Sequence, residues 1–173
     1  MLKNNKCFMT LKKNISDIFT LLNLTSGFVS ILFAVNDKFL MASVFIILSV
    51  VLDFFDGRVA RYLGTESELG AQLDSLSDLV SFGVAPAVLM YLVFNNDILG
   101  LLLVIFVLCG AFRLARFNIL RKKVKGFIGM PITINGVIFP VLYFANAGLV
   151  IVSIVVVASA ALMVSTIHFN KVK

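Results

Sequence analysis

Apolar residues fill long stretches of the chain, and short polar interruptions separate these stretches. The apolar runs cover residues 15–35, 39–59, 76–94, 98–115, 128–144 and 149–169. Several of them reach the length of about 20 residues that an α-helix needs to cross the hydrocarbon core of a bilayer. The interruptions are too short to form an extramembrane domain. The pattern therefore predicts an all-α integral membrane protein with six transmembrane helices.

The composition agrees with this prediction and excludes an ordinary soluble protein. Of the 173 residues, 60% are hydrophobic and only 14% are charged, whereas soluble domains carry about 25% charged residues. We expect residues 1–173 to form a single transmembrane domain, with a basic cytoplasmic segment at residues 1–14. The apolar run after that segment is long and lacks a convincing small-residue cleavage site, which favours a first helix over a removed signal peptide.

The basic residues predict how the helices are oriented. If there are six crossings and both termini are cytoplasmic, all of the fifteen Lys and Arg residues except Lys38 fall on the cytoplasmic side. Lys and Arg concentrate on this side of membrane proteins, so the distribution supports that orientation. The formal net charge of +6 would then lie next to anionic lipid headgroups of the cell membrane. Membrane lipids are the expected partners of this charge, and no nucleic acid is expected.

One charged stretch, residues 53–78, stands out because it lies between two apolar runs. It contains four aspartates, Asp53, Asp56, Asp74 and Asp78. A charged side chain at the centre of a membrane helix costs about 2.5 to 3.5 kcal/mol on insertion scales, so such a cluster suggests function. Asp53 and Asp56 are three residues apart and Asp74 and Asp78 four apart, so each pair shares a helix face. We expect a polar turn over residues 62–73 to fold the second pair back against the first.

Four converging carboxylates would repel one another unless a cation lay among them. Oxygen ligands of this kind suit Mg²⁺, Mn²⁺ or Ca²⁺ better than Zn²⁺, and the single histidine, His168, lies at the far end of the chain. Gly57 and Ala60 leave a hollow beside the first pair for a ligand, or they allow close packing of helices. An ion path through a small cation transporter is the alternative from another class of protein. Against it, the acidic cluster lies near one surface, whereas transporters bind ions near the midplane.

The charged stretch resembles the signature of the CDP-alcohol phosphotransferases at every position. Its pattern, from Asp53 to Asp78, is D-x2-D-G-x2-A-R-x8-G-x3-D-x3-D. The resemblance implies an enzyme with a six-helix core that forms a homodimer. Such an enzyme moves a phosphatidyl-type group from a CDP-activated lipid to an alcohol and releases CMP. The resemblance also implies two divalent metal ions, Mg²⁺ or Mn²⁺, as cofactors.

The same resemblance implies roles for individual residues. The metal ligands would be Asp53, Asp56, Asp74 and Asp78, and Asp78 would also be the general base. The nucleotide pocket would be lined by Gly57, Ala60 and Gly70, while Arg61 would meet a phosphate or tie the helix ends. Near the N-terminus, the stretch TLLNLTSGF places Asn23 where it would approach the nucleotide. A helix-packing role for Asn23 and Gly27 is the alternative.

Three further stretches resemble the phosphatidylserine synthase branch of the family, which includes archaetidylserine synthase-like members: SDLVSFGVAPA from Ser77, CGAFRLARFN from Cys109 and GFIGMPIT from Gly126. This resemblance implies transfer to the hydroxyl group of L-serine, from CDP-diacylglycerol or CDP-archaeol, at the cytoplasmic interface. Arg113 and Arg116 would share a helix face there and hold the serine carboxylate or the lipid pyrophosphate. Positive-inside anchoring is the alternative for both arginines. Glycerol 3-phosphate and inositol phosphate remain alternative acceptors, although a phosphorylated acceptor would require more cationic groups near the site.

Overall fold

The structure is a computed structural model in which every long element is a helix. It describes the backbone of residues 2–63, 67–120, 127–166 and 168–169, and the side chains of residues 17–58, 62, 67–120 and 129–166. The α-helices are α1 (Leu2–Val35), α2 (Phe39–Leu63), α3 (Glu68–Asp78), α4 (Ala85–Phe94), α5 (Asp97–Leu120), α6 (Asn135–Phe144) and α7 (Leu149–Val164). The shorter elements are the π-helix η1 (Leu79–Val84), the 3-10 helix η2 (Ile132–Ile134) and the strands β1 (Phe127–Ile128) and β2 (His168–Phe169).

Four helical segments in the described part of the chain are long and apolar enough to cross a membrane. They are Asp17–Val35, Phe39–Arg58, Glu68–Phe94 and Asp97–Leu120. Two shorter apolar segments follow, Ile132–Phe144 and Leu149–Val164. These shorter segments fall below the length of about 20 residues that a helix perpendicular to the bilayer requires. The structure therefore supports an integral membrane protein, and the count of six crossings stays a prediction.

The predicted polar turn over residues 62–73 is wrong in its extent. α2 continues to Leu63, and α3 already begins at Glu68. The cause is local, because the Ser67 side chain caps α3 by accepting a hydrogen bond of 3.0 Å from the Gly70 N–H. Glu68 then places a negative charge in the first turn, where the helix dipole favours it. Asp74 consequently lies well inside a helix and not at the edge of a turn.

The prediction of one helix over residues 128–144 is also wrong. Residues Phe127–Ile128 form strand β1, which pairs antiparallel with β2, and regular α-helix begins only at Asn135. Gly129 has φ +76°, a left-handed conformation that favours glycine, and Pro131 is extended with ψ 136°. The last predicted helix likewise ends at Val164, before β2.

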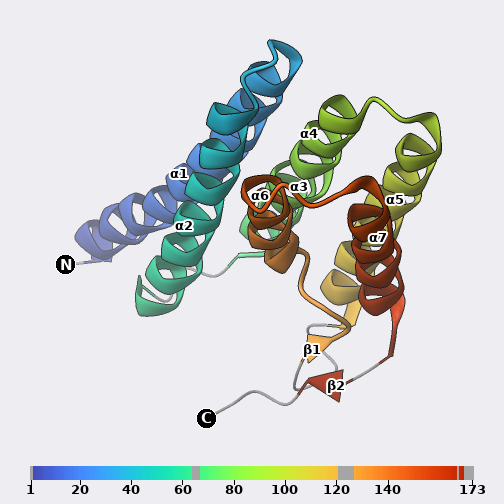
Figure 1. Ribbon diagram of the computed structural model, residues 1–173. Coiled ribbons are helices and arrows are strands. Elements are labelled where there is room, and N and C mark those ends of the chain that lie inside the picture. The colour runs from blue at the N-terminus through green and yellow to red at the C-terminus, as the bar shows by residue number, and fades with distance from the viewer. Residues whose placement is uncertain (1, 64–66, 121–126, 167, 170–173) are drawn as a thin grey trace.

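The long helical segments alternate in direction, with α3, η1 and α4 forming one continuous segment, so that the chain returns repeatedly to the same end of the molecule (Figure 1). The turn between α1 and α2 and the turn between α4 and α5 lie at the upper end of the view. The C-terminal ends of α2, α5 and α7, the start of α3 and the β1–β2 pair lie at the lower end. α1 packs along α2, and α5 packs along α7.

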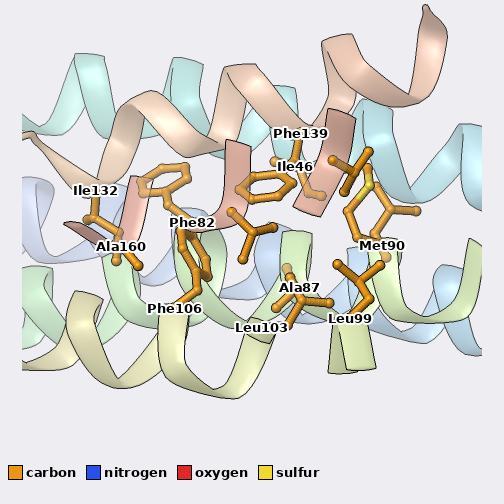
Figure 2. Close-up of a cluster of buried hydrophobic side chains, with 14 of the residues drawn as sticks. Ile46, Phe82, Ala87, Met90, Leu99, Leu103, Phe106, Ile132, Phe139 and Ala160 are labelled. Carbon is orange, nitrogen blue, oxygen red and sulfur yellow. The ribbon is translucent and has the colours of Figure 1, made fainter. Parts of the chain in front are cut away.

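A cluster of buried apolar side chains, mostly from the second half of the chain but including Ala42 and Ile46 of α2, joins the helices (Figure 2). The Phe106 ring of α5 meets the Phe139 ring of α6 edge to face, with 5.2 Å between the ring centroids, and Phe82 of η1 is fully buried beside them. The contact between α1 and α2 is different because serines line it. Ser26 and Ser30 donate hydrogen bonds of 2.8 Å to carbonyls of α2, which is typical of membrane helices that pack through small polar residues.

Candidate metal-binding and catalytic site

Three of the four motif aspartates converge between α2 and α3. Asp53 comes from α2, and Asp74 and Asp78 come from successive turns of α3. One carboxylate oxygen from each lies within 4.8 Å of the others. Asp53 and Asp74 are half-buried, and only 8% of Asp78 is exposed. The predicted meeting of the two halves of the motif is therefore present in the fold.

The three carboxylates fit a hard divalent cation. Oxygens at this separation can share one ion or bridge two, and carboxylate oxygens are the ligands that Mg²⁺ and Mn²⁺ prefer. One buried oxygen of Asp78, Oδ1, has no hydrogen-bond partner among the described residues. A buried polar atom normally has a partner, so this oxygen is well suited to bind a metal or a substrate proton.

Asp56 lies one turn after Asp53 on α2, outside the group of three. Its side chain is buried, and one carboxylate oxygen accepts a hydrogen bond from the Thr20 hydroxyl of α1. The role of Asp56 as a metal ligand stays a prediction. The contact with Thr20 fixes the plane of its carboxylate.

The small residues of the motif differ in their exposure. Gly57 is exposed on α2, whereas the side chains of Ala60 and Arg61 lie outside the described residues. Gly70 is half-buried in the first turn of α3. A Cβ atom there would lie 3.1 Å from Ser67 Oγ and 3.5 Å from Asp17 Oδ1. Gly70 thus lets the capped start of α3 approach α1.

The two arginines of α5 have separate surroundings. Only 5% of Arg113 is exposed, its guanidinium interacts electrostatically with the Asp78 carboxylate, and it lies 5.4 Å from the centre of the Phe117 ring. Its Nε has no hydrogen-bond partner among the described residues. Arg113 is therefore a buried cation within electrostatic range of Asp78, and its Nε is available as a donor.

Arg116 instead binds the C-terminal end of α7. Its guanidinium donates hydrogen bonds to the backbone carbonyls of Val164 at 2.9 Å, Met163 at 3.2 Å and Ser165 at 3.0 Å. These carbonyls lack partners within the helix, so a cation is favourable at this position. Arg113 and Arg116 therefore have different binding partners, although they lie on the same face of α5.

Asn23 lies in the middle of α1 and is almost completely buried, with 1% of its surface exposed. Neither its Oδ1 nor its Nδ2 has a hydrogen-bond partner among the described residues. Its backbone carbonyl accepts hydrogen bonds from the Ser49 hydroxyl at 3.3 Å and the Ser81 hydroxyl at 3.0 Å. The free amide is compatible with the predicted ligand contact, and the carbonyl contacts show that the same residue also contributes to helix packing.

Sequence reasoning missed Thr20 and Ser77. Thr20 donates to Asp56, and its own carbonyl accepts a hydrogen bond of 3.1 Å from the Ser77 hydroxyl, next to Asp78. One signal was available, since Thr20, Asn23 and Gly27 share a helix face by spacing. Threonines are nevertheless common in apolar helices, so Thr20 could not be recognised as a site residue before its contact with Asp56 was known.

Comparisons with known proteins agree with the motif. The sequence profile of the CDP-alcohol phosphatidyltransferase family matches residues 13–167. A CDP-diacylglycerol–serine O-phosphatidyltransferase of Methanocaldococcus jannaschii is 44% identical over 157 residues, covering 91% of this chain and 74% of the relative. An archaetidylserine synthase of Methanothermobacter thermautotrophicus is 36% identical over 164 residues, covering 90% and 69%. A CDP-diacylglycerol–serine O-phosphatidyltransferase of Bacillus subtilis is 41% identical over 135 residues, covering 76% of each chain.

Proposed function

This chain belongs to the CDP-alcohol phosphatidyltransferase family of membrane enzymes, and on that premise we propose that it transfers a phosphatidyl-type group from a CDP-activated lipid to the hydroxyl group of L-serine. The observation that carries the proposal is the convergence of Asp53, Asp74 and Asp78 from both halves of the family motif. We assign L-serine as the acceptor because relatives at 36 to 44% identity are serine O-phosphatidyltransferases or an archaetidylserine synthase.

In the proposed reaction, Asp78 accepts the proton of the serine hydroxyl. The serine oxygen then forms a bond to the lipid-linked phosphorus of the CDP-lipid, and the bond from this phosphorus to the oxygen shared with the CMP phosphate breaks. CMP leaves with that oxygen and its electron pair. Asp78 is suited to this role because it is buried and one of its oxygens has no hydrogen-bond partner among the described residues.

The remaining site residues bind and orient. Asp53, Asp56, Asp74 and Asp78 would hold two divalent ions, Mg²⁺ or Mn²⁺, which when bound neutralise the negative charge of the phosphate oxygens. The nucleotide end of the lipid would lie against Gly57, Ala60, Arg61 and Gly70, with Asn23 nearby.

Arg113 is the arginine that we propose for anion binding. It is buried within electrostatic range of Asp78, and its Nε has no hydrogen-bond partner among the described residues, whereas the guanidinium of Arg116 already binds the end of α7. From this position Arg113 would hold the serine carboxylate or a lipid phosphate so that the serine hydroxyl faces Asp78.

We further propose six crossings, both termini in the cytoplasm, an active site at the cytoplasmic interface of the cell membrane, and a homodimer. The course of the helices supports this arrangement, because the C-terminal ends of α2 and α5 point toward the same end of the molecule while the turn that holds Lys38 lies at the opposite end (Figure 1). Labelling of single cysteines by a membrane-impermeant reagent tests the orientation. Mass photometry in detergent tests the dimer.

The activity itself is tested by CMP release from purified protein with Mg²⁺ or Mn²⁺. CDP-diacylglycerol and CDP-archaeol are offered in turn with L-serine, glycerol 3-phosphate or inositol phosphate. We expect release with L-serine, and we expect Asp78→Asn to abolish it. Asp37→Asn is the matched control, because Asp37 is exposed in the opposite turn and its φ of 57° suits asparagine. Release with another acceptor alone would refute the serine assignment while preserving the family chemistry.

A further inference from the structure

Two helices supply the motif carboxylates, but those helices are not held together by direct packing. Among the described residues, α2 and α3 scarcely touch, whereas α1 packs against both of them. α2 also touches η1 and α4, which continue the α3 segment, but at the level of the carboxylates α1 is the element that packs against both α2 and α3. A small shift of α1 against either neighbour would change the distances between the carboxylates.

One turn of α1 provides hydrogen bonds to both halves of the site. The Thr20 hydroxyl donates to the Asp56 carboxylate of α2, and the Thr20 carbonyl accepts a hydrogen bond of 3.1 Å from Ser77 of α3. One turn later, the Asn23 carbonyl accepts hydrogen bonds from Ser49 of α2 and Ser81 of η1. Thr20 is buried, with 3% of its surface exposed, so its contacts are formed where water does not compete for them.

We propose that Thr20 is a positioning residue for the metal-binding carboxylates. Its hydroxyl sets the orientation of Asp56, and its carbonyl holds Ser77, which immediately precedes Asp78. Residues that hydrogen-bond to metal ligands orient them, and losing such a residue typically weakens metal affinity or activity about 10- to 100-fold. The inference rests on the proposed function, because it requires the motif carboxylates to bind a divalent metal.

The test is Mn²⁺ binding to the purified full chain in detergent, measured by electron paramagnetic resonance of the free ion. Thr20→Val removes the hydroxyl and keeps the shape of the side chain, while Thr20→Ser restores a hydroxyl. Thr25→Val is the matched control, since Thr25 is an exposed threonine of the same helix whose hydroxyl donates to Leu21 O, at 2.7 Å, within α1. If Thr20→Val does not fold, the smaller Thr20→Ala takes its place in the same measurement.

We expect the Mn²⁺ dissociation constant to rise about tenfold or more in Thr20→Val and to stay within about twofold of the wild-type value in Thr20→Ser and Thr25→Val. A role limited to helix packing would lower the melting temperature of Thr20→Val and leave its Mn²⁺ affinity unchanged, and this result would overturn the inference alone. If the wild-type protein bound no Mn²⁺, or bound it equally well after Asp78→Asn, the proposed metal site would fail and the inference with it.

Discussion

The carboxylates of Asp53 and Asp78 lie within 4.8 Å of each other, although Asp53 belongs to α2 and Asp78 ends α3. Two negative charges at this separation in a partly buried site repel strongly. α1 packs against both helices, and α2 also touches η1 and α4, which continue from α3, so these contacts hold the two carboxylates close together. Like charges that the fold keeps close together are typical of a cation-binding site. The stability of the protein should therefore depend on bound metal, and this dependence can be measured.

We expect Asp53→Asn to raise the melting temperature of the metal-free protein, because one of the repelling charges is removed. Added Mg²⁺ should stabilise the wild-type protein, by about 2.7 kcal/mol when its concentration is 100 times the dissociation constant, but should not stabilise this variant. Thermal unfolding in detergent with and without EDTA measures both effects. Asp37→Asn should keep the response of the wild type. An undiminished response to Mg²⁺ in Asp53→Asn would show that the three carboxylates are not the metal site.

Arg113→Gln removes the buried cation that interacts electrostatically with Asp78 and keeps much of the side chain. Since a charge-assisted hydrogen bond contributes about 1.5 to 3 kcal/mol, we expect the KM for L-serine to rise roughly 10- to 100-fold. Steady-state CMP release at varied serine concentration measures this change. Arg58→Gln is the control, because Arg58 is exposed and its guanidinium lies 4.6 Å from the ring centre of Phe54 on its own helix. An unchanged KM for L-serine and an unchanged rate in Arg113→Gln would exclude an anion-binding role.

Arg116→Gln should act on stability and not on acceptor binding. The change removes three hydrogen bonds from Arg116 to the last carbonyls of α7. We expect it to destabilise the protein by roughly 2 to 3 kcal/mol, with a lower melting temperature and an unchanged KM for L-serine in the folded fraction. A raised KM for L-serine at an unchanged melting temperature would instead show that Arg116 contributes to acceptor binding.

Gly27→Ala should disturb the crossing of α1 and η1. A Cβ atom at position 27 would lie 2.3 Å from Ser81 Oγ and 2.7 Å from Ser81 Cα, so the helices would have to separate. We expect a loss of about 1 to 3 kcal/mol in stability, measured by thermal unfolding, together with weaker metal binding. Gly148→Ala is the matched control, because nothing lies within 4 Å of its Cβ position and its φ is −70°. A Gly27→Ala variant as stable as the wild type would show that the crossing can relax.

The motif aspartates and the apolar runs could both be read from the sequence. Each depends on residue type and spacing alone. A long apolar run has few alternatives to a membrane helix, and carboxylates three or four residues apart share a helix face whatever surrounds them. The helix break before Asn135 could not be predicted from the apolar pattern of the sequence. It depends on the left-handed conformation of Gly129 and on the pairing of β1 with the distant β2.

The sequence by itself therefore determined a helical membrane protein with a carboxylate site of a known family. Only the tertiary structure decided that Asp53, Asp74 and Asp78 form the close group while Asp56 bonds to Thr20. It alone distinguished the two arginines, because it buries Arg113 within electrostatic range of Asp78 and binds Arg116 to the end of α7. The physical reason is that periodicity specifies which face of a helix a side chain occupies, whereas its hydrogen-bond partners come from segments that are distant in the chain and meet only after the helices have packed.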